Sequence, residues 1–334
     1  MPLIQSSDYH AKGPFKNAFF NTVYPALLRK VNDLEYKRER FTTTDGDFVD
    51  LDWSRVGSKR LVLTLHGLEG QSDRAYIRGM IKYFNQGGWD GLAMNYRGCS
   101  GEPNLQLQSY HMAATADVHE VLAHVMKDGI YEDLVIVGFS LGGNLTLRLL
   151  AEVANDPPSW LKAGVAFSVP CDISSANAEI HRWFNYLYLR RFLKTLNEKA
   201  KIKAKQFPDK VQLPTKMPTT FYEFDDWFTG PIHGFGSGAN YYAQANSLQV
   251  LDAIKTPVLL INANDDTFLS SACYPEEIGR RSQYLFFERP AHGGHVGFGQ
   301  FNSSMPYWSE QRAFRFVEMI LGSNVKKALN TTKS

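Results

Sequence analysis

The feature that most constrains how this chain can fold is the pentapeptide Gly-Phe-Ser-Leu-Gly at residues 138–142. An apolar, β-branched run at 135–137 precedes it, and a helix-forming stretch at 145–154 follows it. A strand that enters a helix through so tight a turn needs small residues beside the turn, because strand and helix approach closely there. The turn presents the serine hydroxyl outside the sheet, at the positive end of the helix. The pattern therefore predicts that Ser140 is a nucleophile.

Strands and helices alternate on both sides of this motif, as is typical of a parallel sheet covered by helices on both faces. The expected strands are 60–65, 91–94, 163–168, 258–261 and 284–287, and the expected helices are 76–84, 113–126 and 311–320. Two further short strands, 39–44 and 48–54, are joined by Asp45-Gly46, a pair that suits a hairpin turn. We predict an α/β fold with a mostly parallel central sheet.

The alternation stops between residues 173 and 245, where no central strand is evident and aromatic residues are frequent. Ile180, Trp183, Phe184 and Leu187 have the i, i+3, i+4, i+7 spacing of an amphipathic helix. We expect a helical cap here, whose apolar stripe either seals against the core or lines a substrate site. The expected organisation is a helical extension over 1–38, a core over 39–172 and 246–334, and the cap over 173–245.

The composition of the chain limits which classes of protein it can belong to. A hydrophobic content of 44% supports a sizeable core, and a formal charge of +2 gives no basis for nucleic-acid binding. The three cysteines have unrelated spacings, and the sequence contains neither a zinc-type ligand pair nor a phosphate-binding loop. We therefore expect no metal and no cofactor. No apolar run approaches the roughly 18 residues of a membrane span, the N-terminus lacks a signal-peptide core, and the expected location is cytoplasmic.

Two segments carry an additional interpretation, contact with a membrane surface. Near the N-terminus, apolar residues recur at near-helical spacing, which indicates a helix packed on the domain or, in the alternative, a shallow membrane attachment: Phe15, Phe19, Phe20, Tyr24, Leu27 and Leu28.

The cap contains a basic stretch, which is either a solvated helix face or a region attracted to anionic lipid or to an acidic substrate. Its members are Arg190, Arg191, Lys194, Lys199, Lys201, Lys203 and Lys205.

A serine nucleophile needs a base, usually a histidine, which a carboxylate orients. In this architecture both follow the serine along the chain, each after a later strand. One such strand leads into Asp265 and Asp266, and the next leads into His292 and His295. Two glycines directly before His295 give its loop the freedom to reach Ser140, so we expect His295 as the base and His292 as a polar loop residue. We expect Asp266 as the acid, while Asp265 binds backbone amides that hold the turn.

When a serine attacks a carbonyl carbon, the oxyanion that forms needs hydrogen-bond donors. One is expected to be the backbone N–H of Leu141, the residue after the nucleophile. The other is expected in the loop that follows the strand 60–65, where we choose the backbone N–H of Leu68. His66 directly follows that strand, and orienting the loop is its expected role.

Five motifs in this order resemble the YheT-like group of the α/β-hydrolase superfamily, bacterial relatives of the eukaryotic ABHD1/ABHD3 group. The resemblance covers residues 40 to 320 approximately. It implies the α/β-hydrolase fold and a triad of Ser140, Asp266 and His295, in a group whose members act on carboxylic esters and phospholipids or transfer acyl groups. The motifs occupy residues 66–70, 95–101, 138–144, 262–266 and 293–298.

Residues and resemblance together predict a serine hydrolase, a carboxylic ester hydrolase (EC 3.1.1.-), that forms an acyl-enzyme on Ser140. Its expected partner is a small ester or lipid-like molecule with a hydrophobic acyl group, and the sequence indicates no particular oligomeric state. An acyltransferase that passes the acyl group to an alcohol is the first alternative. A non-catalytic ligand-binding protein is the second, although such a protein would be expected to lack a member of the triad.

Overall fold

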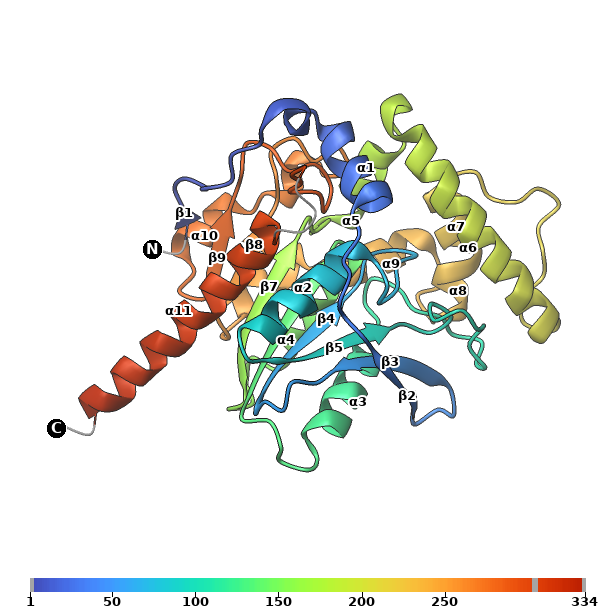
Figure 1. Ribbon diagram of the computed structural model, residues 1–334. Helices are drawn as coiled ribbons and strands as arrows, with labels where there is room; N and C mark the ends of the chain where they lie inside the picture. Colours follow the sequence, from blue (N-terminus) through green and yellow to red (C-terminus); the bar gives the residue numbers. More distant parts are fainter. Residues whose placement is uncertain (1–2, 302–305, 332–334) are drawn as a thin grey trace.

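The computed structural model describes residues 3–301 and 306–331, with residues 323–331 by their backbone alone. At its centre is a nine-stranded sheet in the order β1-β9-β8-β7-β6-β4-β5-β3-β2 (Figure 1). The strands are β1 (Leu3–Ile4), β2 (Lys37–Thr42), β3 (Phe48–Ser54), β4 (Arg60–Leu65), β5 (Asp90–Asn95), β6 (Asp133–Phe139), β7 (Leu161–Phe167), β8 (Val258–Ile261) and β9 (Leu285–Glu288). The predicted mostly parallel sheet is confirmed, since among the described strands the antiparallel pairs are β2 with β3 and β3 with β5.

Helices cover both faces of the sheet because successive strand residues point to opposite sides. Leu61 and Leu63 of β4 pack in one cluster with α3 (Thr115–Met126) and α4 (Leu141–Glu152). Val62 and Val137 belong to a second cluster with α2 (Ala75–Gln86) and α11 (Trp308–Thr331). The strands are apolar on both faces for this reason, and the sheet is the centre of the core.

Between β7 and β8, the described residues form helices and no strand. These are α5 (Ile173–Ile180), η2 (Trp183–Asn185), α6 (Tyr186–Gln206), α7 (Phe221–Phe224), η3 (Asp225–Thr229), α8 (Gly230–Ile232), α9 (Gly238–Ala245) and η4 (Leu248–Ala253). In Figure 1, α6 lies on the outside of this group. Two further short helices, η5 (Ser271–Cys273) and α10 (Glu276–Arg281), follow β8.

The expected amphipathic helix through Ile180, Trp183 and Leu187 is wrong. The helix is interrupted between α5 and α6, and Trp183 is 86% exposed although Ile180 is buried. The break is held by the buried side chain of Asn185, whose amide donates hydrogen bonds to the carbonyls of Glu179 (3.0 Å) and Thr267 (2.7 Å). A side chain that satisfies backbone carbonyls in this way competes with the helix.

The N-terminal segment contains the expected helix, α1 (Ala18–Leu28), preceded by η1 (Gly13–Lys16). It also supplies β1, which the sequence analysis did not anticipate and which pairs in parallel with β9. Of the helices within the described residues, none combines the length and the apolar character that crossing a membrane requires.

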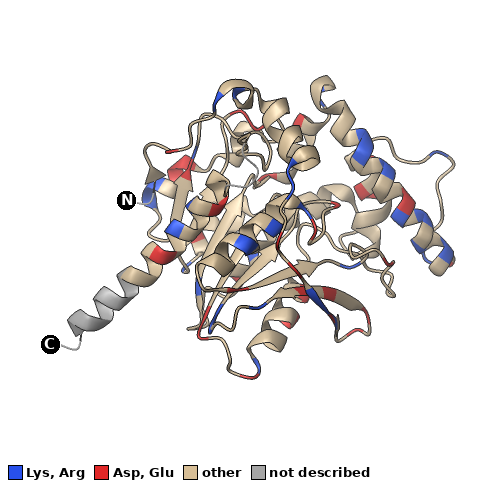
Figure 2. Ribbon diagram, in the orientation of Figure 1, with Lys and Arg blue, Asp and Glu red and all other residues tan. Residues whose placement is uncertain are grey.

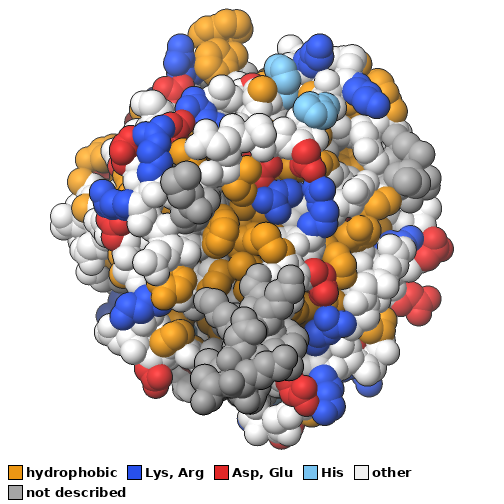
Figure 3. Space-filling view, turned by 90° about the vertical axis from the view of Figure 1, so that its left-hand side faces the viewer, with side chains coloured by type: hydrophobic (Ala, Val, Ile, Leu, Met, Phe, Trp, Pro, Cys, Tyr) orange, Lys and Arg blue, Asp and Glu red, His pale blue; other side chains and the backbone are white. Residues whose placement is uncertain are grey.

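Charged residues of both signs are spread along the ribbon of the core, whereas the charged residues of α6 are mainly Lys and Arg (Figure 2). The face that holds the two chain ends is turned toward the viewer in Figure 3, and on it apolar side chains lie among Lys, Arg, Asp and Glu. Charged residues on α6 are thus mainly positive, whereas the face in Figure 3 carries both signs.

Candidate active site

Ser140 occupies the turn between β6 and α4. Its φ is 52° and its ψ is −115°, a backbone conformation that residues other than glycine rarely adopt. The flanking glycines make this turn sterically feasible. A Cβ on Gly138 would clash with the carbonyl oxygen of Gly142, and a Cβ on Gly142 would clash with that of Leu65. The strain costs about 1–3 kcal/mol, which the packed surroundings offset. The sequence argument for small residues beside the serine therefore agrees with the geometry.

The structure brings Ser140, His295 and Asp266 into one hydrogen-bonded chain. The Nε2 atom of His295 lies 3.0 Å from Ser140 Oγ, and its Nδ1 atom lies 2.9 Å from Asp266 Oδ2. The Asp266 side chain is completely buried and also accepts a hydrogen bond from the backbone N–H of Phe268 (3.0 Å). The ring of Phe268 stacks on the imidazole of His295 at 4.2 Å. The imidazole is thus fixed at both nitrogen atoms and on one face.

The competing pair, Asp265 and His292, lies beside this chain and does not reach Ser140. Asp265 Oδ2 is 3.3 Å from His292 Nδ1, and its Oδ1 accepts a hydrogen bond from the backbone N–H of Gly294 (2.9 Å). Burial raises the pKa of Asp265. The amide that Asp265 binds belongs to the histidine loop and not to its own turn, so Asp265 supports the position of His295.

The loop after β4 runs directly beside Ser140, since a Cβ on Gly67 would lie 3.3 Å from Ser140 Cβ. Two neighbouring N–H groups of this loop are already engaged: Gly67 donates to the Tyr76 hydroxyl (3.1 Å) and Glu69 to the Tyr110 hydroxyl (2.9 Å). Among the described residues, neither Leu68 N–H nor Leu141 N–H has an acceptor. These are the two N–H groups that the sequence analysis selected as oxyanion donors, and that assignment stays a prediction.

His66 is fully buried and orients this loop. Its Nδ1 lies 2.7 Å from the carbonyl oxygen of Gly67, and its Nε2 lies 3.4 Å from the backbone nitrogen of Tyr96, which donates to it. Burial lowers the pKa of His66 to about 3, so the ring is neutral at physiological pH. A neutral, doubly hydrogen-bonded ring suits the positioning role expected for His66.

The sequence analysis missed the contribution of α1 to the histidine loop. Thr22 Oγ1 accepts a hydrogen bond from the backbone N–H of His295 (2.9 Å) and donates to the carbonyl of Ala18 (2.8 Å). Asn21, completely buried, accepts from the backbone N–H of Gly299 (2.8 Å) through Oδ1. The sequence feature that could have indicated this contribution is the pair of polar residues within an otherwise apolar helix. Nothing in the sequence indicates which loop these residues bind.

A cavity of about 840 Å³ opens beside Ser140 and His295. Its size falls within the range of pockets that enclose small ligands. Its wall combines α1, the loops after β4 and β5, α5, α6 and α7, with an apolar lining that includes Val23, Leu68, Leu141, Ile180, Phe192 and Phe228. Within the described part of the chain, no group of His, Cys, Asp and Glu residues is arranged to hold a metal ion.

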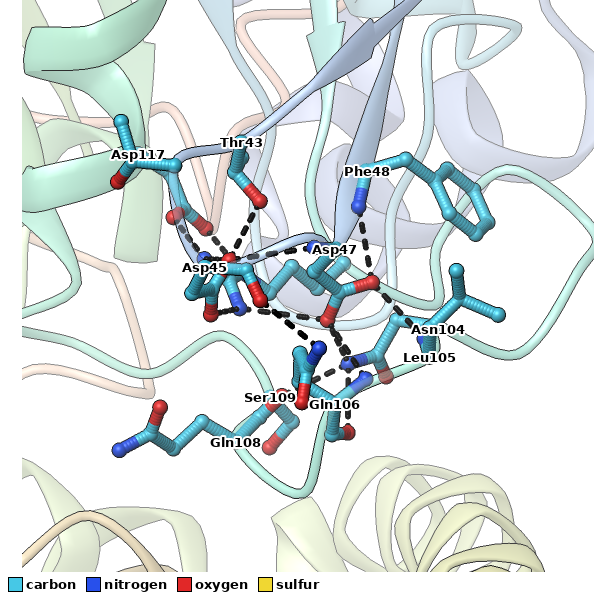
Figure 4. A network of polar contacts seen from close by, with 12 residues as sticks. Thr43, Asp45, Asp47, Phe48, Asn104, Leu105, Gln106, Gln108, Ser109 and Asp117 are labelled. Atoms are coloured by element: carbon cyan, nitrogen blue, oxygen red, sulfur yellow. Dashed lines mark hydrogen bonds and ion pairs between the residues drawn. The ribbon is translucent and has the colours of Figure 1, made fainter.

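One wall of the cavity, the loop after β5, is fixed by the network in Figure 4. The Asp47 carboxylate accepts hydrogen bonds from the Asn104 side chain (2.6 Å) and from the backbone N–H groups of Leu105 (2.8 Å) and Gln106 (3.1 Å). Arg97, at the start of the loop, pairs with Asp117 on α3 (2.6 Å). These contacts tie the loop to the turn between β2 and β3 and to α3.

Two lysines attach α6 to the core beside this wall. Lys203 Nζ donates to the carbonyl oxygens of Asn104 (2.7 Å) and Gln106, and burial lowers the pKa of Lys203 to about 8. Lys199 Nζ lies 2.7 Å from the carboxylate of Glu69, the residue that follows Leu68. Two members of the basic stretch therefore hold the cap onto the loops that border the cavity.

Comparisons with known proteins agree with this architecture. Residues 60–301 match the family described as alpha/beta hydrolase fold. YheT of Escherichia coli (strain K12), a candidate esterase, is 33% identical over 302 residues, which cover 88% of this chain and 87% of YheT. The mouse phospholipase ABHD3 is 29% identical over 276 residues, which cover 79% of this chain and 67% of that protein.

Among solved structures, the Pyrococcus furiosus esterase Pf2001 has the same fold. It superposes with a TM-score of 0.57 at 19% sequence identity, over 87% of this chain and 96% of the esterase. The mostly parallel sheet, the strained serine turn and these matches lead to one conclusion. The chain belongs to the alpha/beta hydrolase fold family, in its YheT-like group.

Proposed function

We propose that this protein is a serine hydrolase that cleaves carboxylic esters with a hydrophobic acyl group. The observation that carries the proposal is the chain of hydrogen bonds from Ser140 Oγ to His295 (3.0 Å) and on to Asp266 (2.9 Å), beside an apolar cavity. Relatives described as an esterase and a phospholipase support ester or lipid-like molecules as the substrate class.

In this proposal Ser140 Oγ attacks the carbonyl carbon of the ester while His295 Nε2 accepts the serine proton. Asp266 keeps Nδ1 protonated and stabilises the imidazolium that forms. The oxyanion of the tetrahedral intermediate accepts hydrogen bonds from the N–H groups of Leu68 and Leu141, each worth about 2.7–4 kcal/mol of transition-state stabilisation. His295 then protonates the departing alcohol, which leaves the acyl group on Ser140. A water molecule, deprotonated by His295, then attacks the acyl carbonyl carbon; the bond to Ser140 Oγ breaks, His295 returns the proton to Oγ, and the acid leaves.

The parts of the chain take different roles in this reaction. The core, residues 39–172 and 246–334, carries the reacting groups, while the cap over 173–245 encloses the acyl chain and the extension over 1–38 positions the histidine loop.

The three cysteines are free and buried, which fits a reducing compartment, so we place the enzyme in the cytoplasm. Transfer of the acyl group to an alcohol would use the same residues, and adding an alcohol to the assay distinguishes the two reactions.

Replacement of the nucleophile tests the proposal. For the wild type, the catalytic efficiency on nitrophenyl esters from two to sixteen carbons should rise with acyl length until the cavity is full, since each buried methylene contributes about 0.8 kcal/mol. Ser140→Ala should lower turnover on the order of a million-fold. Its melting temperature should change little, because alanine keeps the same backbone conformation and the hydroxyl that is lost bonds, among the described residues, only to His295. Retention of more than a few per cent of the activity would remove Ser140 from the mechanism.

The two aspartates should differ in what they affect. Asp266→Asn should lower turnover about 10⁴-fold, because the imidazole loses the acceptor that fixes its tautomer. Asp265→Asn should act mainly on the melting temperature, through a weaker hydrogen bond to Gly294. Steady-state kinetics and thermal unfolding of both variants provide the comparison. The opposite ranking of the two turnover numbers would show that Asp265 is the acid.

Thr22 should act as a positioning residue. Thr22→Val has nearly the same shape but leaves the His295 N–H without its acceptor, and a displaced imidazole should lower kcat by about 10- to 100-fold with little change in KM. Thr22→Ser keeps the hydroxyl and should restore kcat. Measuring kcat, KM and the melting temperature for both variants separates positioning from stability, and equal kcat values in the two would contradict the role assigned to Thr22.

A further inference from the structure

The helix α1 has an unusual surface for a helix exposed to water. It contains no charged residue, yet Phe19, Leu27 and Leu28 are 50%, 65% and 62% exposed. An exposed helix face normally carries polar or charged side chains. The side chain of Phe301, also exposed, continues this apolar surface, because its ring lies 5.7 Å from that of Tyr24.

A second group of exposed apolar side chains lies in η2 and the first turn of α6: Trp183, 86% exposed, together with Tyr186 and Leu187. The two groups lie side by side, since the rings of Phe19 and Tyr188 are 5.9 Å apart, and Figure 1 shows α1 next to the first turns of α6. We call the residues Phe19, Leu27, Leu28, Trp183, Tyr186 and Leu187 the apolar rim.

Part of the apolar rim borders the entrance of the cavity. Phe19, Leu27 and Leu187 are each at least half exposed and also line the cavity that contains Ser140 and His295. A side chain can do both only where the cavity meets the surface. A molecule that leaves an apolar environment at the rim would therefore enter the cavity without crossing open water.

Unpaired positive charge lies next to the apolar rim. Arg190, Arg191 and Lys194 are exposed and follow Leu187 at intervals of three, four and seven residues, so they share its face of α6. Lys201 and Lys205 continue that face. Within the described residues none of these five side chains forms an ion pair, in contrast to Lys199, which binds Glu69 in the loop after β4. Figure 2 shows this positive charge along α6.

We propose that the apolar rim and the basic face of α6 together bind the surface of an anionic phospholipid bilayer. Aromatic and aliphatic side chains insert at the headgroup boundary, and each Lys or Arg near an anionic surface strengthens binding about fivefold. A second copy of this chain is a poorer occupant, because a two-fold contact would place the basic face against itself. Entry of substrate from the bilayer rests on the function proposed above, whereas binding to the bilayer does not.

Vesicle sedimentation of the full chain tests the proposal. The protein should bind vesicles of phosphatidylcholine with phosphatidylglycerol more tightly than phosphatidylcholine alone, and added salt should weaken that binding. The double variant Trp183→Ser/Leu28→Ser removes two rim residues that do not line the cavity, and it should bind at least about tenfold more weakly. Lys194→Glu/Lys201→Glu should remove the preference for phosphatidylglycerol.

The matched control is Val56→Ser/Ile130→Ser, which removes two exposed apolar side chains from the loops that precede β4 and β6, at the opposite ends of these strands from Ser140. It should bind vesicles like the wild type, and all three double variants should hydrolyse a water-soluble acetate ester normally. Equal binding by the rim and control variants would overturn the proposal. So would a change from dimer to monomer in the rim variant without any loss of vesicle binding. Ser140→Ala should still bind vesicles, so a failure of the proposed catalysis is distinguishable from a failure of membrane binding.

Discussion

The close approach of β6 and α4 around Ser140 is the constraint on which the rest of the site depends. Two glycines allow the strand and the helix to meet, and the serine between them takes a positive φ. This turn places the hydroxyl at the carboxyl edge of the parallel sheet. It also leaves the N–H of Leu141 at the first position of α4, where no helical carbonyl can accept its hydrogen bond.

Parallel pairing brings the other groups to the same edge. The chain continues from β4 into Leu68, from β8 into Asp266 and from β9 into the loop of His295, and in a parallel sheet all these carboxyl ends lie together. A different contact holds each of these loops in position. His66 fixes the first, Asp266 and Phe268 fix the imidazole, and Thr22 holds the backbone of His295 from outside the sheet. Rigid support of this kind is what keeps reacting atoms within a few tenths of an ångström of a productive geometry.

Features of the fold and of the site could be predicted from the sequence where they depend on neighbouring residues. The serine turn, the alternating strands and the loops after them are local patterns, and the choice of His295 over His292 followed from the two glycines, of which Gly294 has φ 57°. Contacts between distant segments carry no such pattern. Neither the pairing of β1 with β9 nor the hydrogen bond from His295 to Thr22 could be predicted from spacing. The prediction of one helix through Trp183 was wrong for the same reason. Asn185, which interrupts the helix, donates a hydrogen bond to Thr267, a residue far away in the sequence.

The central claim is that His295 and Asp266 activate Ser140 as a nucleophile. Covalent labelling with a fluorophosphonate, followed by peptide mass mapping, tests this most directly, because the reagent reacts with serine hydroxyls that a neighbouring base activates. The wild type should give a single modified peptide that contains Ser140, Ser140→Ala should take up no label, and His295→Ala should be labelled much more slowly. Labelling at another serine, or equal rates in the wild type and His295→Ala, would contradict it.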